Sequence, residues 1–242
     1  MWEPKYTVSN KLLKNLTHIA GIKGQLSGRK LPKVVFMEMW RVAQDLSTHA
    51  STSIEGNPLS LTVVKEVIKG QPQNAVNSEI EVMNYNKILV WLDSEMDKGK
   101  LRIDLNLILK IQKQVTSSLL PKYDCGVLRK RAVVVNDPRT RQIIFIPPDC
   151  GDVPALLKQL LEFVDKNRGK LDPIILAGLL HKQMVLIHPF MDGNGRTTRL
   201  TTKILLSDLG LDTFNLFSFE MWNNHFFFCY FIDYHCICNT FK

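Results

Sequence analysis

The sequence lacks any apolar run long enough to cross a bilayer. Its longest such stretch, FFFCYFIDYHCIC near the end, is too short and contains Asp233. The start, MWEPKYTVSNKLLKN, has no basic region followed by an apolar core, so no signal peptide is visible. The 5 cysteines are odd in number and have no paired spacing, which argues against a disulfide framework. We therefore expect no membrane association and a reducing, cytoplasmic location.

The sequence also lacks an unusually high content of charged residues. Charged residues make up 22% of the chain and the net charge is +8, which suits an anionic ligand such as a nucleotide or a nucleic acid. The basic residues are scattered and are not arrayed on one helix with interleaved aromatics, so we do not expect nucleic-acid binding. With 45% hydrophobic residues, the 242-residue chain can bury a sizeable core. The sequence leaves open whether the chain forms a homo-oligomer.

Repeats and low-complexity linkers are absent, and helical spacing of apolar residues dominates. These patterns predict helices over residues 33–53, 60–69, 77–98, 104–118, 152–167, 172–187 and 196–209. Three of these helices have a typical N-cap residue at the start, namely Ser60, Asp152 and Asp172. Two of them have a glycine at the end, Gly56 and Gly210. We expect a mainly α fold with an N-terminal helical region over 1–76, a core over 77–219 and an atypical tail over 220–242.

One segment departs from the helical pattern. Two β-branched runs flank Asn136-Asp137-Pro138-Arg139, which predicts a β-hairpin over residues 132–146.

The end of the chain differs in composition from what precedes it. Residues 221–242 hold eight aromatics and three of the 5 cysteines with almost no charge. This composition fits a buried hydrophobic tail, a metal site, or an aberrant C-terminus from a truncated or frame-shifted gene. The metal-ligand types are His225, Cys229, His235, Cys236 and Cys238. Because Cys236-Ile237-Cys238 lacks the two-residue gap of a zinc knuckle, we favour the aberrant C-terminus.

The most informative stretch is HPFMDGNGRTTR at 188–199, between two predicted helices. His188 can accept a proton near neutral pH. Residues 193–195 open the second helix, where backbone N–H groups converge on an anion, and Arg196 and Arg199 share one face of that helix and can reach the same phosphates. Asp192 would face those phosphates, and Mg²⁺ is the natural bridge between them. Each residue alone has a structural explanation, but together they indicate phosphoryl or nucleotidyl transfer to a hydroxyl.

These residues resemble the signature of the Fic family, and every fixed position is matched. The resemblance runs from about residue 30 to about 218 and includes GVLR at 126–129, the prolines at 147–148 and STSIEGN at 51–57. It implies a Fic fold whose members mostly transfer AMP from ATP to a protein Ser, Thr or Tyr hydroxyl. The hairpin would be a flap that aligns a target segment by strand addition.

The resemblance also implies a role for each motif residue. His188 would be the catalytic base, Asp192 would bind Mg²⁺, and Phe190 would anchor the loop in the core. The nucleotide would be held by Gly193, Asn194, Gly195, Arg196 and Arg199. Gly195 favours nucleotidyl transfer over phosphorylation, because the related Doc branch, which resembles a kinase, carries lysine there.

A second segment, Ser51-Thr52-Ser53-Ile54-Glu55-Gly56, resembles the inhibitory motif of the family. Ser51 and Glu55 are four apart and share a helix face. A glutamate at a helix C-terminus is disfavoured by the helix dipole, so a positive partner is expected, and the resemblance names Arg199. Glu55 would then occupy the position of the ATP γ-phosphate.

The sequence therefore predicts a self-inhibited, Mg²⁺-dependent protein adenylyltransferase that uses ATP and a hydroxyl-bearing target protein. Two alternatives stay open. Glu55 could instead position water to remove AMP from a modified protein, or the chain could be a catalytically defective nucleotide-binding interaction module.

Overall fold

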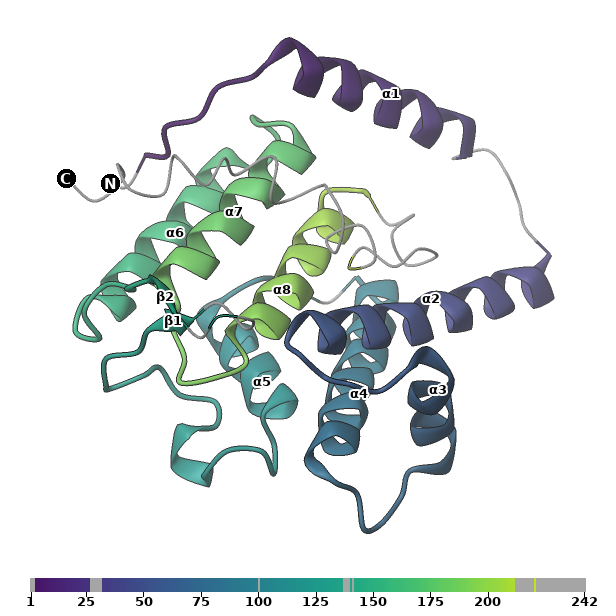
Figure 1. Ribbon diagram of the computed structural model, residues 1–242. Coiled ribbons are helices and arrows are strands. Elements are labelled where there is room, and N and C mark those ends of the chain that lie inside the picture. The colour runs from purple at the N-terminus through teal and green to yellow at the C-terminus, as the bar shows by residue number, and fades with distance from the viewer. Residues whose placement is uncertain are drawn as a thin grey trace.

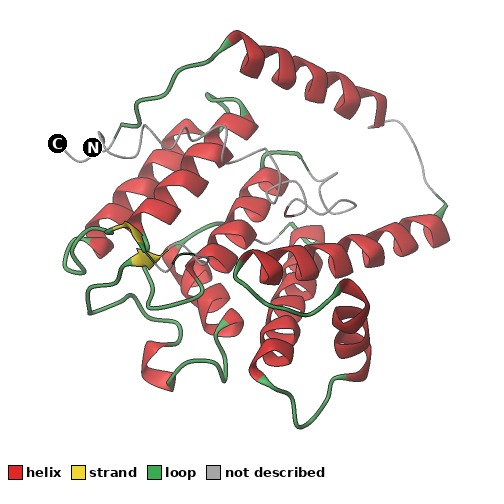
Figure 2. Ribbon diagram, in the orientation of Figure 1, coloured by secondary structure: helices red, strands yellow, loops and turns green. Residues whose placement is uncertain are grey.

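The computed structural model describes residues 3–26, 32–99, 101–136, 140, 142–211 and 220. Within these residues the regular secondary structure is helical apart from one two-stranded sheet (Figure 2). The helices are α1 (Asn10–Leu26), α2 (Lys33–Ile54), α3 (Leu61–Gly70), α4 (Asn77–Asp97), α5 (Leu105–Val115), α6 (Val153–Asn167), α7 (Pro173–Ile187) and α8 (Asn194–Asp208), with a 3-10 turn at Lys122–Asp124. The strands are β1 (Val135–Asn136) and β2 (Ile143–Phe145).

The predicted mainly α fold is confirmed, and most helix bounds agree within three residues. Ser60 and Asp172 act as N-caps as predicted, because their side chains accept hydrogen bonds from Val63 N and Ile174 N. Asp152 occupies the N-cap position of α6 but makes no such bond. Helix α1 is absent from the predicted set, and its interior Gly21 and Gly24 weaken the helical signal.

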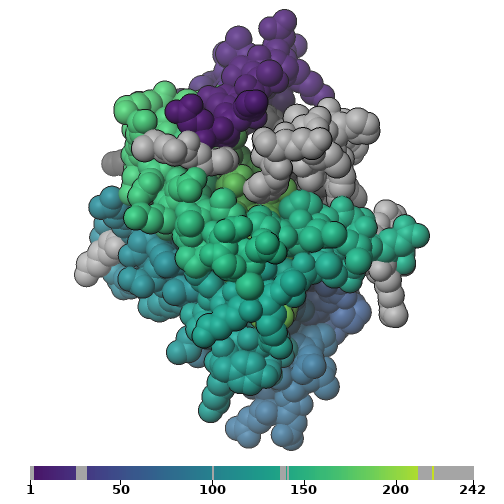
Figure 3. Space-filling view, turned by 90° about the vertical axis from the view of Figure 1, so that its left-hand side faces the viewer, coloured from purple at the N-terminus to yellow at the C-terminus, as the bar shows by residue number. Residues whose placement is uncertain are grey.

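Helices α7 and α8 form the centre of the core, and α7 is the more apolar of the two. Helix α7 is apolar around most of its circumference and packs against α6 on one side and α8 on the other (Figure 1). Helices α4 and α5 pack against the opposite side of α8, and α2 and α3 lie against α4. Helix α1 lies along the top of the view in Figure 1, and its residue Leu12 is buried. The space-filling view shows the purple N-terminal segment at one end of the face formed by the green and teal segments (Figure 3).

The predicted hairpin is present but short. β1 and β2 are antiparallel, with Val135 opposite Phe145 and Asn136 opposite Ile143, and the ladder is irregular between these pairs. Residues 137–139 and 141 of the connecting loop lie outside the described residues. None of the helices in the described part of the chain is long and apolar enough to cross a membrane.

The predicted tail lies almost entirely outside the described residues, and so do the metal-ligand types named in it. Glu220 is the exception. Its side chain is fully buried and accepts a hydrogen bond from the Tyr85 hydroxyl at 2.8 Å. Glu220, the first residue of the predicted tail, therefore contacts α4 through Tyr85.

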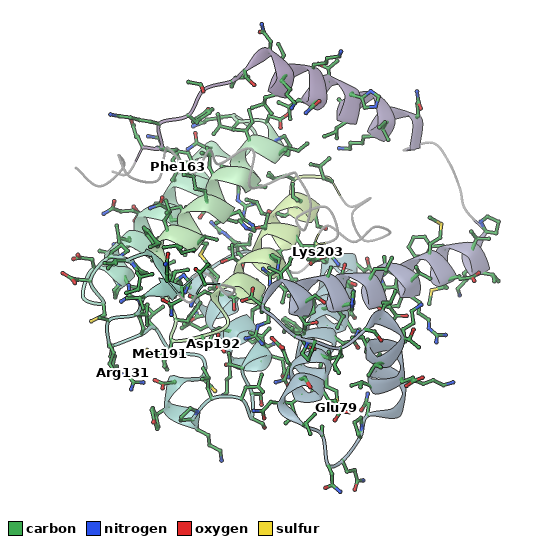
Figure 4. All side chains as sticks on the ribbon, in the orientation of Figure 1. Glu79, Arg131, Phe163, Met191, Asp192 and Lys203 are labelled. Atoms are coloured by element: carbon green, nitrogen blue, oxygen red, sulfur yellow. The ribbon has the colours of Figure 1, made fainter. Side chains whose placement is uncertain are left out.

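A buried ion pair joins three helices of the bundle. Lys203 Nζ of α8, labelled in Figure 4, lies 2.8 Å from Asp93 Oδ1 of α4. The second oxygen of Asp93 accepts a hydrogen bond of 2.9 Å from Gln44 Nε2 of α2. The side chains of Lys203 and Asp93 are 5% and 1% exposed. Each charge therefore depends on the other, because neither can be solvated by water.

Replacing Lys203 with methionine should destabilise the fold strongly, because it leaves the Asp93 carboxylate buried with only Gln44 as a partner. We expect the free energy of unfolding in urea to fall by about 3–5 kcal/mol. The matched control is Lys98→Met, which removes a lysine from the half-exposed Lys98–Glu95 pair and should cost less than about 1 kcal/mol. Equal losses in the two variants would contradict the assigned weight of the buried pair.

Candidate functional site

The loop between α7 and α8 is built by unusual backbone geometry at both ends. His188 is the C-cap residue of α7, and its φ of 47° lies in the left-handed region that non-glycine residues rarely adopt. Gly193 precedes α8 with a φ of 77°. Between them Phe190 is fully buried, as the sequence predicts. Asn194 closes the loop, because its side-chain oxygen accepts from Phe190 N and its amide donates to Phe190 O, both at 2.9 Å.

Two buried side chains from outside the loop fasten its backbone. Gln112 of α5 donates to the Asp192 carbonyl at 3.2 Å and accepts from the backbone N–H of Gly126. Arg129 Nε donates to the His188 carbonyl at 2.8 Å, and its Nη2 donates to Pro148 O at the base of the hairpin. Arg129 therefore joins the hairpin to the loop. The sequence predicts a role for neither residue.

His188 is suited to accept a proton. Its Nδ1 lies 3.4 Å from the Val185 carbonyl. Since a carbonyl can only accept, this contact places the ring hydrogen on Nδ1 and leaves Nε2 with its lone pair. Burial lowers the pKa of His188 below its ordinary value, and the positive charge of Arg129 adds to this, against the opposing influence of Val185 O, Glu55 and Asp192. The imidazole is therefore neutral at physiological pH.

Arg196 points toward α4 and is held between two carboxylates. Its Nη1 lies 2.8 Å from Glu81 Oε1, and its Nη2 lies 3.2 Å from Asp192 Oδ2. The other Glu81 oxygen accepts from Asn57 Nδ2 at 2.7 Å. Glu81 thus connects Arg196 to the turn that follows α2. Among the described residues, Arg196 Nε is buried and has no hydrogen-bond partner.

Arg199 points the other way, toward the C-terminal end of α2. Its Nε donates to Ser51 Oγ at 2.8 Å, and its Nη2 donates to Ser51 O at 2.9 Å and to Glu55 Oε1 at 2.6 Å. Glu55 is the C-cap residue of α2. The predicted contact between Glu55 and Arg199 is therefore present, and Ser51 adds two bonds to the same guanidinium. In this structure Arg196 and Arg199 turn to different helices, and the prediction that both reach the same phosphates stays a prediction.

Glu55 is ionised in this arrangement. Burial raises the pKa of its carboxyl, but the charge and hydrogen bond of Arg199 outweigh burial, with help from Arg196 and His188, and the net pKa lies below the ordinary value. Gly195 makes room for the carboxylate. A Cβ atom at position 195 would overlap Glu55 Oε1, so any side chain there must displace Glu55 or be displaced by it.

A hollow of about 330 Å³ opens beside these residues. It is lined by Glu55, Asn57, Glu81, Asp192 and Arg196, together with Gly56, Pro58, Asn77, Ser78 and Leu119. Asp192, labelled at the exposed edge of the loop in Figure 4, has a side chain that is 51% exposed. A larger hollow of about 450 Å³ lies between α2, α3 and α4, away from His188.

The acidic side chains do not form a complete metal cage. Among the described residues, no group of three or more His, Cys, Asp or Glu side chains could hold a metal ion. Asp192 alone is accessible next to the Arg196 guanidinium, which is the setting for a cation that takes one carboxylate from the protein and its other ligands from phosphate and water. Mg²⁺ accepts this kind of coordination.

The structure therefore gathers every predicted site residue around one loop. His188, Asp192 and Gly193 to Arg196 belong to the loop and the first turn of α8, and Ser51 and Glu55 reach it from α2. The Asn194 side chain is fully used within the loop, so only its backbone is available to a ligand. Sequence reasoning missed Glu81, Gln112 and Arg129. Of these, only Arg129 belongs to one of the short motifs named for the family resemblance, GVLR at 126–129.

Comparisons with known proteins agree with this geometry. Residues 102–206 match the model of the Fic/DOC family. Protein adenylyltransferase Fic of Nematostella vectensis is 30% identical over 167 residues, which cover 66% of this chain and 36% of that protein. Protein adenylyltransferase fic-1 of Caenorhabditis elegans is 29% identical over 177 residues, which cover 71% and 33%. The chain thus spans about a third of the length of these curated relatives.

A solved structure shows the same fold. The crystal structure of a Fic family protein from Desulfovibrio desulfuricans G20 superposes with a TM-score of 0.75 at 21% identity. The match covers 97% of this chain and 69% of that one.

The Glu55–Arg199 pair should make stability depend on pH in a defined direction. Because folding lowers the Glu55 pKa, its contribution is complete above the unfolded value of about 4.3 and is lost as the pH falls through the lower folded value. We expect Glu55→Gln to reduce the free energy of unfolding at pH 7 by about 1–2 kcal/mol. The gap between the variant and the wild type should close below about pH 4. Urea unfolding at several pH values measures it, and a gap that does not change with pH would contradict the ionised pair.

Proposed function

We propose, from the Fic/DOC family domain that residues 102–206 form, that this protein transfers AMP from ATP to a hydroxyl group of a target protein. The observation that carries the proposal is the loop after α7. It places the lone pair of His188 in the same loop as a half-exposed carboxylate, a guanidinium and the N-terminus of a helix. The curated relatives are named protein adenylyltransferases, which supports the same reaction.

The chemistry follows from the positions of these groups. His188 Nε2 takes the proton of the target hydroxyl as its oxygen attacks the α-phosphorus of ATP. The bond from this oxygen to phosphorus forms while the bond from phosphorus to the β-phosphate oxygen breaks, and pyrophosphate leaves. Arg196 and the first N–H groups of α8, which have no intrahelical acceptor, hold phosphate oxygens and stabilise the developing charge.

Magnesium fits this scheme through Asp192. The carboxylate would supply one ligand and the phosphate oxygens others, and the bound ion would neutralise charge on the phosphates. Arg196 lies 3.2 Å from the same carboxylate, so it competes for Asp192 in the present arrangement and would turn toward the phosphates when nucleotide binds.

The position of Glu55 supports self-inhibition within one chain as part of this proposal. Its carboxylate forms an ion pair of 2.6 Å with the Arg199 guanidinium. The phosphates of ATP would have to compete with this carboxylate for Arg199. The target would dock along the hairpin, where Ile143, Ile144 and Ile146 are exposed and a strand could be added.

The central test is a Glu55→Gly variant incubated with labelled ATP. We expect labelling of itself or of lysate proteins to rise on the order of ten- to a hundredfold, because Arg199 is released to bind phosphate. Arg199→Ala also breaks the pair but removes the phosphate ligand, so it should not activate, and the double variant should match Arg199→Ala. His188→Ala in the Glu55→Gly chain should abolish labelling while ATP still binds.

Each alternative has its own outcome in this experiment. ATP binding without any transfer by Glu55→Gly would indicate a nucleotide-binding interaction module. Release of AMP from an already modified protein, faster with Glu55 than with glycine, would indicate the reverse reaction, in which Glu55 positions water.

A second test addresses the metal through binding alone. In the Glu55→Gly chain, Asp192→Asn keeps the side-chain shape and removes its charge. We expect ATP to bind this variant equally well in Mg²⁺ and in EDTA, whereas the parent should bind it more tightly in Mg²⁺. Calorimetric titration measures both affinities. Asp97→Asn, at an exposed aspartate on α4, is the control and should keep the Mg²⁺ dependence; the same dependence in Asp192→Asn would remove Asp192 from the metal site.

A further inference from the structure

Glu81 of α4 is a largely buried carboxylate that contacts the candidate site through Arg196. Its Oε1 lies 2.8 Å from Arg196 Nη1, and the two side chains are 14% and 4% exposed. Arg196 Nη1 also lies 3.4 Å from the Val115 carbonyl. The contact at the other nitrogen is longer and more accessible, since Nη2 lies 3.2 Å from Asp192 Oδ2 and the Asp192 side chain is 51% exposed. The guanidinium is therefore held more firmly at its Nη1 end than at its Nη2 end.

The Glu81 carboxylate is itself oriented by Asn57, in the turn that follows Glu55. Asn57 Nδ2 donates to Glu81 Oε2 at 2.7 Å and to the Ser78 carbonyl at 2.9 Å. Asn57 Oδ1 accepts from the backbone N–H of Leu59 at 3.1 Å. Because the Ser78 carbonyl can only accept and the Leu59 N–H can only donate, the amide has one consistent orientation. Each Glu81 oxygen therefore accepts from a different donor, one from Arg196 and one from Asn57.

This arrangement suits an arginine that exchanges one partner and keeps another. In the proposed reaction Mg²⁺ and the phosphates engage Asp192, and Arg196 Nη2 is then free to meet phosphate oxygens. The Glu81 contact is on the opposite nitrogen, so it does not have to break at that step. A side chain that is already held loses less conformational entropy when it binds a ligand than one that moves freely.

We propose that Glu81 is a positioning residue for Arg196, which fixes Nη1 so that Nη2 is presented to the phosphates of ATP, and that Asn57 holds the Glu81 carboxylate in the required orientation. The inference rests on the proposed function, because it requires that Arg196 binds those phosphates. Glu81 lies outside residues 102–206, which match the Fic/DOC family model. It acts through Arg196 and touches no reacting atom.

A positioning role and a role of charge alone predict opposite effects of neutralising Glu81. A carboxylate close to a phosphate site repels ATP, so a role of charge alone means that Glu81→Gln tightens binding. Positioning means that Glu81→Gln weakens binding. The Glu81 oxygens accept from Arg196 on one side and from Asn57 on the other, so an amide NH₂ group in either place meets a donor. The sign of the change in affinity distinguishes the two roles.

The experiment measures the dissociation constant for Mg²⁺-ATP by calorimetric titration in the Glu55→Gly chain. We expect Glu81→Gln to raise this constant about five- to tenfold. When Arg196→Ala is also present, Glu81→Gln should lower the constant or leave it unchanged, because no guanidinium remains to be positioned and only repulsion is removed. Glu162→Gln, at a half-exposed glutamate of α6, is the control and should leave the constant unchanged with and without Arg196.

Two results would overturn the inference. One is an unchanged or lower dissociation constant in Glu81→Gln when Arg196 is intact. The other is an equal rise in the Arg196→Ala chain, which indicates a general loss of structure. Circular dichroism checks that each variant is folded. If Glu81→Gln does not fold, Glu81→Asp replaces it, because it keeps the charge and shortens the reach to Arg196. Its dissociation constant should rise, and an unchanged value would contradict positioning.

Failure of the proposed function would look different. If the Glu55→Gly chain binds ATP without transferring AMP, adenylyl transfer fails, but the dissociation constants with and without Arg196 still decide the role of Glu81. If Glu81→Gln leaves ATP binding unchanged in a chain that does transfer AMP, only the inference about Glu81 fails. If the Glu55→Gly chain binds no ATP, the proposed function and this inference fail together.

Discussion

The contact between Glu55 and Arg199 determines how the two functional segments of the chain meet. Glu55 stands at the C-terminal end of α2, where the helix dipole disfavours a negative charge, and Arg199 supplies the cation that compensates it. The two residues are 144 positions apart. Because the cation belongs to the motif helix, the same interaction that satisfies the end of α2 also covers part of the candidate site. The stability of the C-terminal end of α2 and the access of a ligand to the candidate site thus both depend on the Arg199 guanidinium.

The rest of the site is fixed by side chains that have no chemical role themselves. Asn194 ties the loop to Phe190, Gln112 holds the Asp192 carbonyl, and Arg129 holds the His188 carbonyl. These bonds are buried or partly buried and involve backbone groups, so they hold the loop independently of its exposed side chains. They also support the left-handed backbone of His188, a conformation that persists only where surrounding structure imposes it. The imidazole is therefore oriented before any ligand arrives.

The sequence predicted most of what is local and little of what is tertiary. Caps such as Ser60 and Asp172 act within one helical turn, so their effect can be predicted from spacing alone. The same spacing placed Arg196 and Arg199 on one face but could not show that they diverge, because long side chains follow their partners on α4 and α2. Glu81 and Tyr85 belong to a helix that was predicted from the spacing of its apolar residues. That spacing does not indicate which polar side chains of different helices contact one another. Helix α1 was missed because its glycines weaken the only signal it has.

Gly195 has a further consequence for how this site can change over time. Its missing side chain is the space that the Glu55 carboxylate fills, so the two positions are not free to vary separately. A lineage that acquired any larger residue at 195 would lose the resting contact in the same step, and one that first lost Glu55 would be free to fill the space. Covariation of these two positions among relatives would thus record a physical exclusion between a side chain and a carboxylate. In this chain, the Glu55–Arg199 contact and an open first turn of α8 are inherited as one trait.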